Sequence, residues 1–140
     1  MKEKLEVDIR VPNQTRYLCL IGKIGEDVAR TLRRYRGDRE ELAYHLNLVL
    51  TEAMANAILH ANADDPDKEI HVTISIHNEI LCVKVYDQGQ GFNIKNLPSP
   101  DFKTLDDHGR GVYIIRSLMD KVSYTKHKGG HVLKMVKSLL

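Results

Sequence analysis

The hydrophobic residues of this 140-residue chain change their spacing twice, from every second residue to every third or fourth and back again. The first pattern, over residues 5–11, is typical of a half-buried strand, which Pro12 ends. Spacings of three and four cover residues 17–35 and again 42–60, and they predict two amphipathic helices. Each element has one apolar face to bury, so helices and strands must pack against one another in layers.

Capping residues predict where the two helices begin. Asn13 can cap the first helix, and Gly22 and Gly25 within it would allow a neighbour to pack closely. Asp38 precedes the second helix, and Glu41 follows three positions later. This spacing is that of a capping box with Asp in the place of Ser or Thr.

The second half of the chain returns to the two-residue period. Strands are predicted over residues 71–77 and 80–86, joined by a tight turn at Asn78-Glu79. Some twenty residues rich in Gly, Asn, Pro, Asp and Lys follow. Irregular segments of that length are usually functional lids or disordered.

A short helix over residues 109–119 and a second hairpin complete the predicted elements. The hairpin strands are expected at 122–124 and 131–136, with the turn at Gly129-Gly130. The order of elements predicts a single domain over residues 1–140. Its fold class is an α+β two-layer sandwich, with a mixed, mainly antiparallel sheet packed against helices.

Composition narrows the classes of function. With 42% hydrophobic and 29% charged residues, the chain can bury a core and is not disordered. The net charge of +2 gives no push towards nucleic acid or a membrane surface, and no segment approaches the roughly 20 apolar residues that span a bilayer. We therefore expect a cytoplasmic protein. Cys19 and Cys82 are expected to be reduced core residues, and the arginines between positions 30 and 39 a solvated helix end.

Three short motifs have residue types suited to chemistry. Glu52 and Asn56 are four apart and share one face of the second helix, where a carboxylate beside an amide oxygen suits Mg²⁺. A solvated polar stripe is the alternative for this pair. The segment Asp87-Gln88-Gly89-Gln90-Gly91 places a carboxylate at a strand end beside backbone that can approach a ligand closely, unless it is a simple turn.

The third motif is Gly109-Arg110-Gly111, at the start of the short helix. Glycines there leave backbone N–H groups free to hold an anion, and Arg110 could bind a phosphate. A flexible capping turn is the alternative. The earlier segment from Asp87 to Gly91 matches neither a P-loop nor a dinucleotide-binding fingerprint, because the required lysine and the third glycine are missing.

The order of the three motifs is more specific than any one of them. A helix with a carboxylate and an amide, a strand ending in an Asp/Gly turn, a loop and a second glycine turn resemble the Bergerat, or GHKL, ATP-binding fold of histidine kinases and gyrase. Across nearly its whole length the chain is similar to anti-sigma-factor serine/threonine kinases of the RsbW and SpoIIAB type. The similarity lies in Glu-Ala-Met-Ala-Asn-Ala-Ile-Leu-His at 52–60 and Gly-Val-Tyr-Ile-Ile-Arg-Ser-Leu-Met-Asp at 111–120.

This resemblance implies ATP and Mg²⁺ as cofactors and a role for each matching residue. Asn56 would bind Mg²⁺ through its amide oxygen, and Glu52 would act as the general base. Asp87 would accept a hydrogen bond from the adenine amino group. The loop at about 93–107 would be the ATP lid.

The glycine motifs have implied roles as well. The backbone at Gly89 and Gly91 would pass close to the nucleotide, while Gly109, Arg110 and Gly111 would hold its phosphates. Phosphoryl transfer depends mainly on positioning and charge neutralisation, so these few groups could suffice.

The chain departs from the kinase pattern at two places. Some of the similar kinases have an arginine just before the second glycine turn, where this chain has Asp107 and His108. A threonine often follows the late glycine pair, where this chain has His131. The first departure puts the catalytic activity in question. The second concerns only how the adenine base is bound.

Two functions follow as expectations. The first is a protein serine/threonine kinase that holds a sigma factor inactive and phosphorylates a STAS-type anti-anti-sigma protein, with a homodimer implied by the resemblance. The second is a nucleotide-gated binding module without phosphotransfer. A histidine-kinase fragment fits less well, because no phosphoacceptor histidine stands on a preceding helical hairpin.

Overall fold

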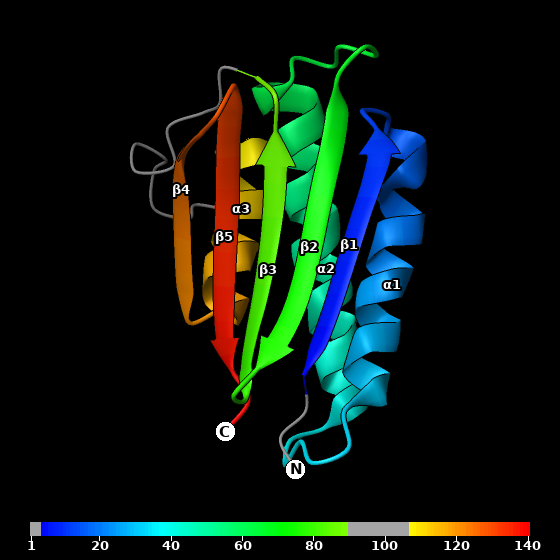
Figure 1. Ribbon diagram of the computed structural model, residues 1–140, viewed down its shortest axis with the longest axis vertical. Coiled ribbons are helices and arrows are strands. Elements are labelled where there is room, and N and C mark those ends of the chain that lie inside the picture. Colours follow the sequence, from blue (N-terminus) through cyan, green and yellow to red (C-terminus); the bar gives the residue numbers. More distant parts are fainter. Residues whose placement is uncertain (1–3, 90–106) are drawn as a thin grey trace.

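The computed structural model describes residues 4–89 and 107–140, in which one five-stranded sheet has all its helices on one face (Figure 1). The strands are β1 (Leu5–Pro12), β2 (Glu69–His77), β3 (Ile80–Asp87), β4 (Lys121–His127) and β5 (Gly130–Ser138). The helices are α1 (Leu18–Thr31), α2 (Arg39–Asn56) and α3 (Asp107–Leu118), with a 3₁₀ turn η1 (Thr15–Tyr17) before α1 and a π-helical turn η2 (Ala57–Ala61) after α2.

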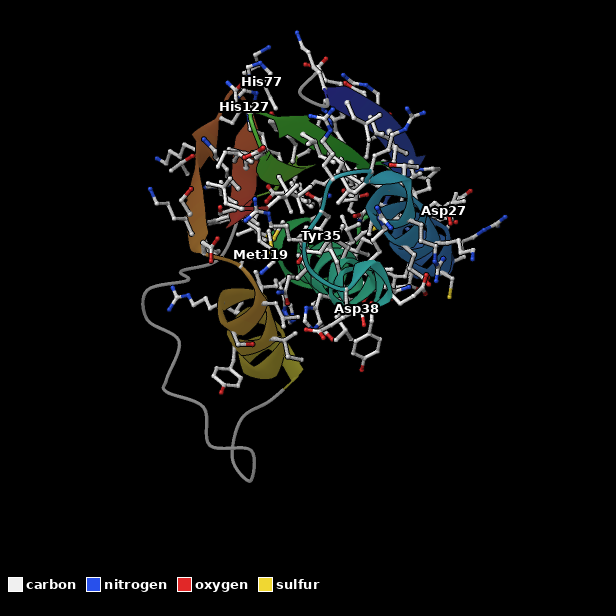
Figure 2. All side chains as sticks on the ribbon, turned by 90° about the horizontal axis from the view of Figure 1, so that it is seen from below. Asp27, Tyr35, Asp38, His77, Met119 and His127 are labelled. Carbon is white, nitrogen blue, oxygen red and sulfur yellow. The ribbon has the colours of Figure 1, made fainter. Side chains whose placement is uncertain are left out.

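The sheet has the strand order β1-β2-β3-β5-β4, and its four pairings are all antiparallel. Helix α2 lies between α1 and α3 beneath the sheet (Figure 2). The predicted two-layer α+β sandwich is confirmed, and no pairing among the described strands is parallel. Because adjacent side chains of a strand point to opposite faces, one face of the sheet meets the helices and the other is open.

The core lies between the sheet and the helices. Ile70, Val72 and Ile74 of β2 are fully buried against α2, whose Leu46 and Leu50 are almost fully buried from the other side. None of the helices within residues 4–89 and 107–140 is both long and apolar enough to cross a bilayer.

Helix α1 ends earlier than its hydrophobic spacing predicts. Its last residue is Thr31, and Leu32 has extended backbone, with φ −64° and ψ 125°. The Arg39 side chain donates hydrogen bonds to the carbonyl groups of Leu32 and Arg33, which replaces the bonds that a further turn would have made. The prediction that Tyr35 belongs to this helix is therefore wrong.

Asn13 does not cap the first helix, which corrects a second expectation. Its side chain is buried; Nδ2 donates to the Asp65 carbonyl at 2.9 Å, and Oδ1 accepts from Asn62 Nδ2 at 3.0 Å. A short amide side chain can hydrogen-bond a distant segment as readily as its own helix. Asn13 thus connects the end of β1 to the segment after α2.

The start of α2 and its packing on α1 agree with the sequence. The Asp38 carboxylate accepts from the backbone N–H groups of Glu40 and Glu41 at 2.9 and 3.3 Å, so the N-cap is confirmed. A Cβ on Gly25 would lie 2.4 Å from Leu50 Cδ1, so the absence of a side chain lets α1 and α2 approach closely.

The first hairpin turn agrees with expectation, whereas the second hairpin differs in its turn and in the length of its strands. Asn78 and Glu79 both have positive φ, 53° and 63°, as a two-residue type I′ turn requires. In the second hairpin the turn is Lys128-Gly129, and Gly130 already belongs to β5. Strand β4 is longer than predicted because its last residues are polar and exposed at the sheet edge, where no hydrophobic alternation marks them.

Three further expectations concern the cysteines, the expected lid and the arginines at the end of α1. Cys19 is exposed rather than in the core, whereas Cys82 is half-buried. Asp107 is the first residue of α3 rather than the last of a lid, and the rest of the expected lid, from 93 to 106, lies outside the described residues. Arg30 at the end of α1 forms ion pairs with Glu26, Asp27 and Glu40, as expected of a solvated helix end.

The Asp38 cap predicts a measurable share of the stability. Replacing Asp38 with Ala leaves the first N–H groups of α2 without their acceptor, so the free energy of unfolding should fall by about 1 kcal/mol. Asp38→Asn retains an acceptor oxygen and serves as the matched control. Urea unfolding of the two variants should separate them, and equal stabilities would contradict the capping role.

Candidate active site

The second half of α2 presents a polar pair to its neighbours. Glu52 is half-buried and Asn56 is 4% exposed, one turn apart on the same helical face. Ala53 and Ala57, next to them in sequence, are buried in the core. An amide at such a buried position is a poor helix former, so packing and contacts with other elements must hold it there.

Gly111 of α3 lies directly against this pair. A Cβ placed on Gly111 would be 2.7 Å from Glu52 Oε2 and 3.5 Å from Asn56 Nδ2. Only a glycine lets the α3 backbone come this close without displacing the carboxylate. The structure therefore brings the second glycine motif to the carboxylate and the amide, although they lie more than fifty residues apart in the chain.

The first glycine motif reaches the end of the same helix. After Asn56 the helix widens into the π turn η2, a form often found at functional sites. A Cβ on Gly89 would lie 1.4 Å from the carbonyl oxygen of Ala61, the last residue of that turn. The Asp87-Gln88-Gly89 turn thus packs on the end of η2 through backbone alone.

A buried amide network holds this turn in place. Asn62 is fully buried; its Oδ1 accepts from the Gln88 backbone N–H at 2.8 Å, and its Nδ2 donates to Asn13. The Gln88 side chain in turn accepts from the Glu69 N–H at 2.7 Å. Three strand ends and the end of η2 are joined by these bonds, which makes the turn after β3 a rigid part of the fold.

Asp87 is the last residue of β3, and its side chain is 2% exposed. One oxygen, Oδ1, accepts from the Gly89 N–H at 3.0 Å, and the other, Oδ2, accepts from the Tyr124 hydroxyl at 2.6 Å. His131 Nδ1 lies 3.6 Å from Oδ1. The carboxylate belongs to the helix-facing side of the sheet, like Val83 and Val85 before it.

Sequence reasoning missed Tyr124. It lies on the edge strand β4, far from any glycine motif, and only the strand register brings it to Asp87. His131 was recognised as a departure, and the register places it directly opposite Asp87. A tyrosine in an amphipathic edge strand has no local signal that distinguishes it from a packing residue.

Part of the expected site lies outside the described residues. Gly91 falls in the segment from 90 to 106, which the structure does not describe. Gly109 and Arg110 lie in the first turn of α3, and only their backbone is described. Of the expected set, Glu52, Asn56 and Gly111 are in direct proximity, and Asp87 and Gly89 are joined to the end of the same helix.

The donor set was compared with the needs of a divalent cation. In residues 4–89 and 107–140 no three His, Cys, Asp or Glu side chains are grouped to hold a metal. Mg²⁺ does not need such a group, because it keeps waters and binds substrate phosphates along with one or two protein oxygens. The Glu52 carboxylate and the Asn56 amide oxygen are hard donors, so they fit Mg²⁺ bound together with a phosphate.

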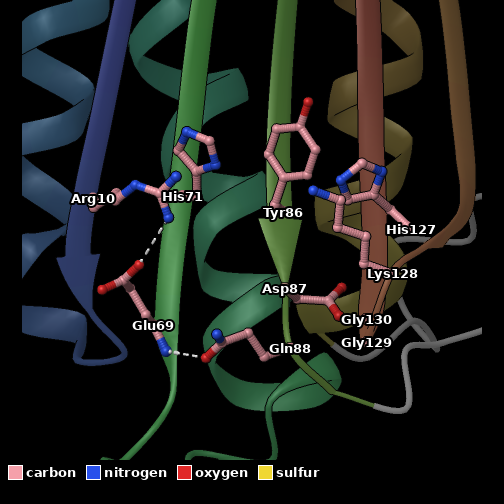
Figure 3. A pocket seen from close by; sticks show the side chains of 10 residues that line it. All are labelled: Arg10, Glu69, His71, Tyr86, Asp87, Gln88, His127, Lys128, Gly129 and Gly130. Carbon is pink, nitrogen blue, oxygen red and sulfur yellow. Dashed lines mark hydrogen bonds and ion pairs between the residues drawn. The ribbon is translucent and has the colours of Figure 1, made fainter.

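A cavity of about 370 Å³ lies on the open face of the sheet (Figure 3). Arg10, His71, Tyr86, His127 and Lys128 line it from four strands and a turn. Its basic side chains have acidic neighbours: Arg10 Nη1 is 3.3 Å from a Glu69 oxygen, and His71 Nε2 is 2.8 Å from an Asp8 oxygen. Asp87 and Gln88 also line this cavity. Glu52, Asn56 and Gly111 do not line it, so the carboxylate–amide pair of α2 and the start of α3 lie on the other face.

Comparison with protein families decides the class of protein. The model of the histidine kinase-like ATPase domain matches residues 20–137. The chain belongs to this family. Its resemblance to the anti-sigma-factor kinases is also confirmed, by the relatives and the family together.

Two relatives of this chain bear on its place within the family. The chain is 27% identical to the serine-protein kinase RsbW of Bacillus subtilis (strain 168) over 131 residues, which is 88% of this chain and 79% of that protein. It is 29% identical to the anti-sigma F factor of Anoxybacillus flavithermus (strain DSM 21510 / WK1) over 99 residues, 67% of this chain and 68% of that protein.

A solved structure supports the fold. The histidine kinase domain from the blue-light activated histidine kinase EL346 of Erythrobacter litoralis superposes with a TM-score of 0.56 at 19% identity. The match covers 92% of this chain and 62% of that one. At this identity the likeness establishes the histidine kinase-like ATPase fold, which agrees with the family model.

The contact between Gly89 and η2 predicts a large effect of a single methyl group. In Gly89→Ala the new Cβ meets the Ala61 carbonyl, which cannot move without breaking η2, so the free energy of unfolding should fall by about 2 kcal/mol or more. Gly129→Ala is the control, because a Cβ there meets nothing within 4 Å. Thermal or urea unfolding measures both. A loss at Gly89 no larger than that at Gly129 would contradict the close approach.

Proposed function

We propose that this chain binds Mg²⁺-ATP between α2 and α3 and transfers the γ-phosphate to a serine or threonine of a STAS-type anti-anti-sigma protein. The chain would also hold a sigma factor inactive. The observation that carries the proposal is the close approach of Gly111 to Glu52 and Asn56, because it brings a carboxylate and an amide side chain to the first turns of a helix.

The start of α3 suits the phosphates. The first N–H groups of a helix have no partner within it, and the helix dipole makes this end positive. Gly109, Arg110 and Gly111 would hold the phosphates there. Because the Glu52 carboxylate lies against the same backbone, a bound phosphate needs a cation between them, and Asn56 would supply the amide oxygen for Mg²⁺. When bound, Mg²⁺ would neutralise charge on the phosphates.

Glu52 would take the proton of the attacking hydroxyl. It is half-buried on a rigid helix, one turn before the proposed metal ligand, so its carboxylate faces the place assigned to the phosphates. A positioned base of this kind contributes about 10²- to 10⁴-fold to a reaction rate. The rest of the catalysis would come from positioning the phosphate and the hydroxyl in line.

The base end of the nucleotide would be read by Asp87. Its carboxylate is an acceptor, and the adenine amino group is a donor. The close backbone of Gly89, and of Gly91 beyond the described residues, would let the nucleotide approach. Asp87 and Gly111 both face the helix layer, so base and phosphates would lie along one side of the sheet.

The proposed partners come from the relatives. RsbW is named a serine-protein kinase, and the anti-sigma F factor is named for what it opposes. We extend these names to a sigma factor and a STAS-type protein as partners in the cytoplasm, with a homodimer and without direct contact to nucleic acid or membrane. β1 and β4 are the edges of the described sheet and offer one route to a dimer.

A second candidate is a nucleotide-gated module that binds a partner without phosphotransfer. It is favoured by the residues at the start of α3, where Asp107 and His108 stand in place of the arginine of some similar kinases. An acid beside the phosphates would not stabilise the charge that develops during transfer. Nucleotide binding would survive this change, and catalysis would not.

Phosphotransfer can be measured directly. Incubated with labelled ATP, Mg²⁺ and its cognate STAS protein, the chain should place label on a serine or threonine of that protein. If the chain binds ATP but no label reaches the STAS protein, the gated module is favoured. If the chain does not bind ATP, both candidates are excluded.

The role of Glu52 is tested by Glu52→Gln, which keeps the shape and removes the base. Phosphotransfer should fall at least about 100-fold, while ATP affinity changes only a few-fold. Glu41→Gln is the matched control, an exposed glutamate in the first turn of the same helix. A Glu52→Gln protein with the wild-type rate would rule out the assigned base.

A further inference from the structure

Asp87 is the centre of a row of side chains that crosses three strands. His131 on β5 is its direct partner in the β3–β5 pairing, and Tyr124 on β4 is opposite Leu133, two residues along from His131. Tyr124 and His131 are therefore diagonal neighbours on the same face of the sheet. Their rings stack with centroids 5.0 Å apart and an angle of 10° between the planes.

The row places the Tyr124 hydroxyl on the carboxylate. Its oxygen lies 2.6 Å from Asp87 Oδ2, while the Gly89 N–H donates to Oδ1 at 3.0 Å. Among the residues that the structure describes, each carboxylate oxygen thus has one hydrogen-bond donor, and two donors on different oxygens fix the plane of the group. Each oxygen can still accept another hydrogen bond.

The stack determines where the hydroxyl can lie. His131 is mostly buried, with its side chain 16% exposed, and its Nδ1 has no hydrogen-bond partner among the described residues. It contributes the flat ring against Tyr124 and an Nδ1 that lies 3.6 Å from Asp87 Oδ1. Because both residues stand on paired strands rather than on a loop, the direction of the Tyr124 hydroxyl is set by the sheet.

We propose that Tyr124, held by the ring of His131, is the positioning residue that turns the Asp87 carboxylate to read the amino group of the base. This inference rests on the proposed function, which assigns the adenine to Asp87. Adenine has a donor at position 6, whereas hypoxanthine has a carbonyl acceptor there. A carboxylate fixed in plane favours the donor and repels the acceptor, so the row would set the preference for adenine.

Tyr124→Phe removes the hydroxyl and keeps the ring. The carboxylate then loses one of its two fixed donors and can turn, so its readout of the amino group weakens. Calorimetric titration with ADP and with inosine diphosphate, both with Mg²⁺, gives the ratio of affinities. This ratio should favour ADP in the wild type and fall roughly tenfold in Tyr124→Phe.

Matched variants separate positioning from a general loss of structure. Tyr86→Phe makes the same change one residue before Asp87, on the open face of the sheet, and should leave the ratio unchanged. His131→Ala removes the ring that holds Tyr124 and should lower the ratio, whereas His131→Phe restores a flat ring and should recover it. A general loss of stability would weaken both nucleotides together and leave their ratio constant.

The outcomes distinguish this inference from the proposed function. A wild-type ratio that persists in Tyr124→Phe and in His131→Ala overturns the positioning role while nucleotide binding stands. Equal wild-type affinities for the two nucleotides also overturn it. If wild-type protein binds no ADP, the proposed function fails, and this inference fails with it.

Discussion

Three glycines let other parts of the backbone pack closely on α2 and on the turn η2 that follows it. Gly25 of α1 packs on Leu50, Gly111 of α3 on Glu52 and Asn56, and Gly89 after β3 on the end of η2. These contacts determine how near α1, α3 and the sheet edge come to one helix. The candidate site exists because two of the three, at Gly111 and Gly89, bring polar groups to the second half of α2 and to η2 directly after it.

The sheet separates two surfaces of different character. On the helix side, a carboxylate and an amide of α2 meet the positive end of α3, and Asp87 is buried at the edge. On the open side, the cavity has an arginine and a histidine near carboxylates of neighbouring strands. Of the two described surfaces, the first combines hard oxygen donors with a helix N-terminus whose dipole suits an anion, which is why we propose nucleotide binding there.

The sequence predicts best those features of the fold that depend on residues close together in the chain. The Asp38 cap, the turn at Asn78-Glu79 and the fold class follow from local spacing and turn chemistry, and the structure confirms them. The errors arise where distant residues compete. Asn13 bonds to Asn62 rather than capping its helix, and Arg39 binds the carbonyl groups of Leu32 and Arg33 directly after the end of α1.

The sequence predicts candidate members of the site but not the residues that support them. The spacing of Glu52 and Asn56 places them on one face of any helix, and a resemblance to known ATP-binding domains singles out Asp87. Tyr124 is different, because its contact with Asp87 depends on how two later strands pair. The same register brings the His131 ring against Tyr124.

The most direct measurement is a crystal structure of the chain with Mg²⁺ and a non-hydrolysable ATP analogue. The account predicts the phosphates at the start of α3, the Asn56 amide oxygen bound to Mg²⁺, and the adenine amino group within hydrogen-bond distance of Asp87. A nucleotide seated in the open-face cavity, or on the helix side without contact to Asn56 and Asp87, would contradict it.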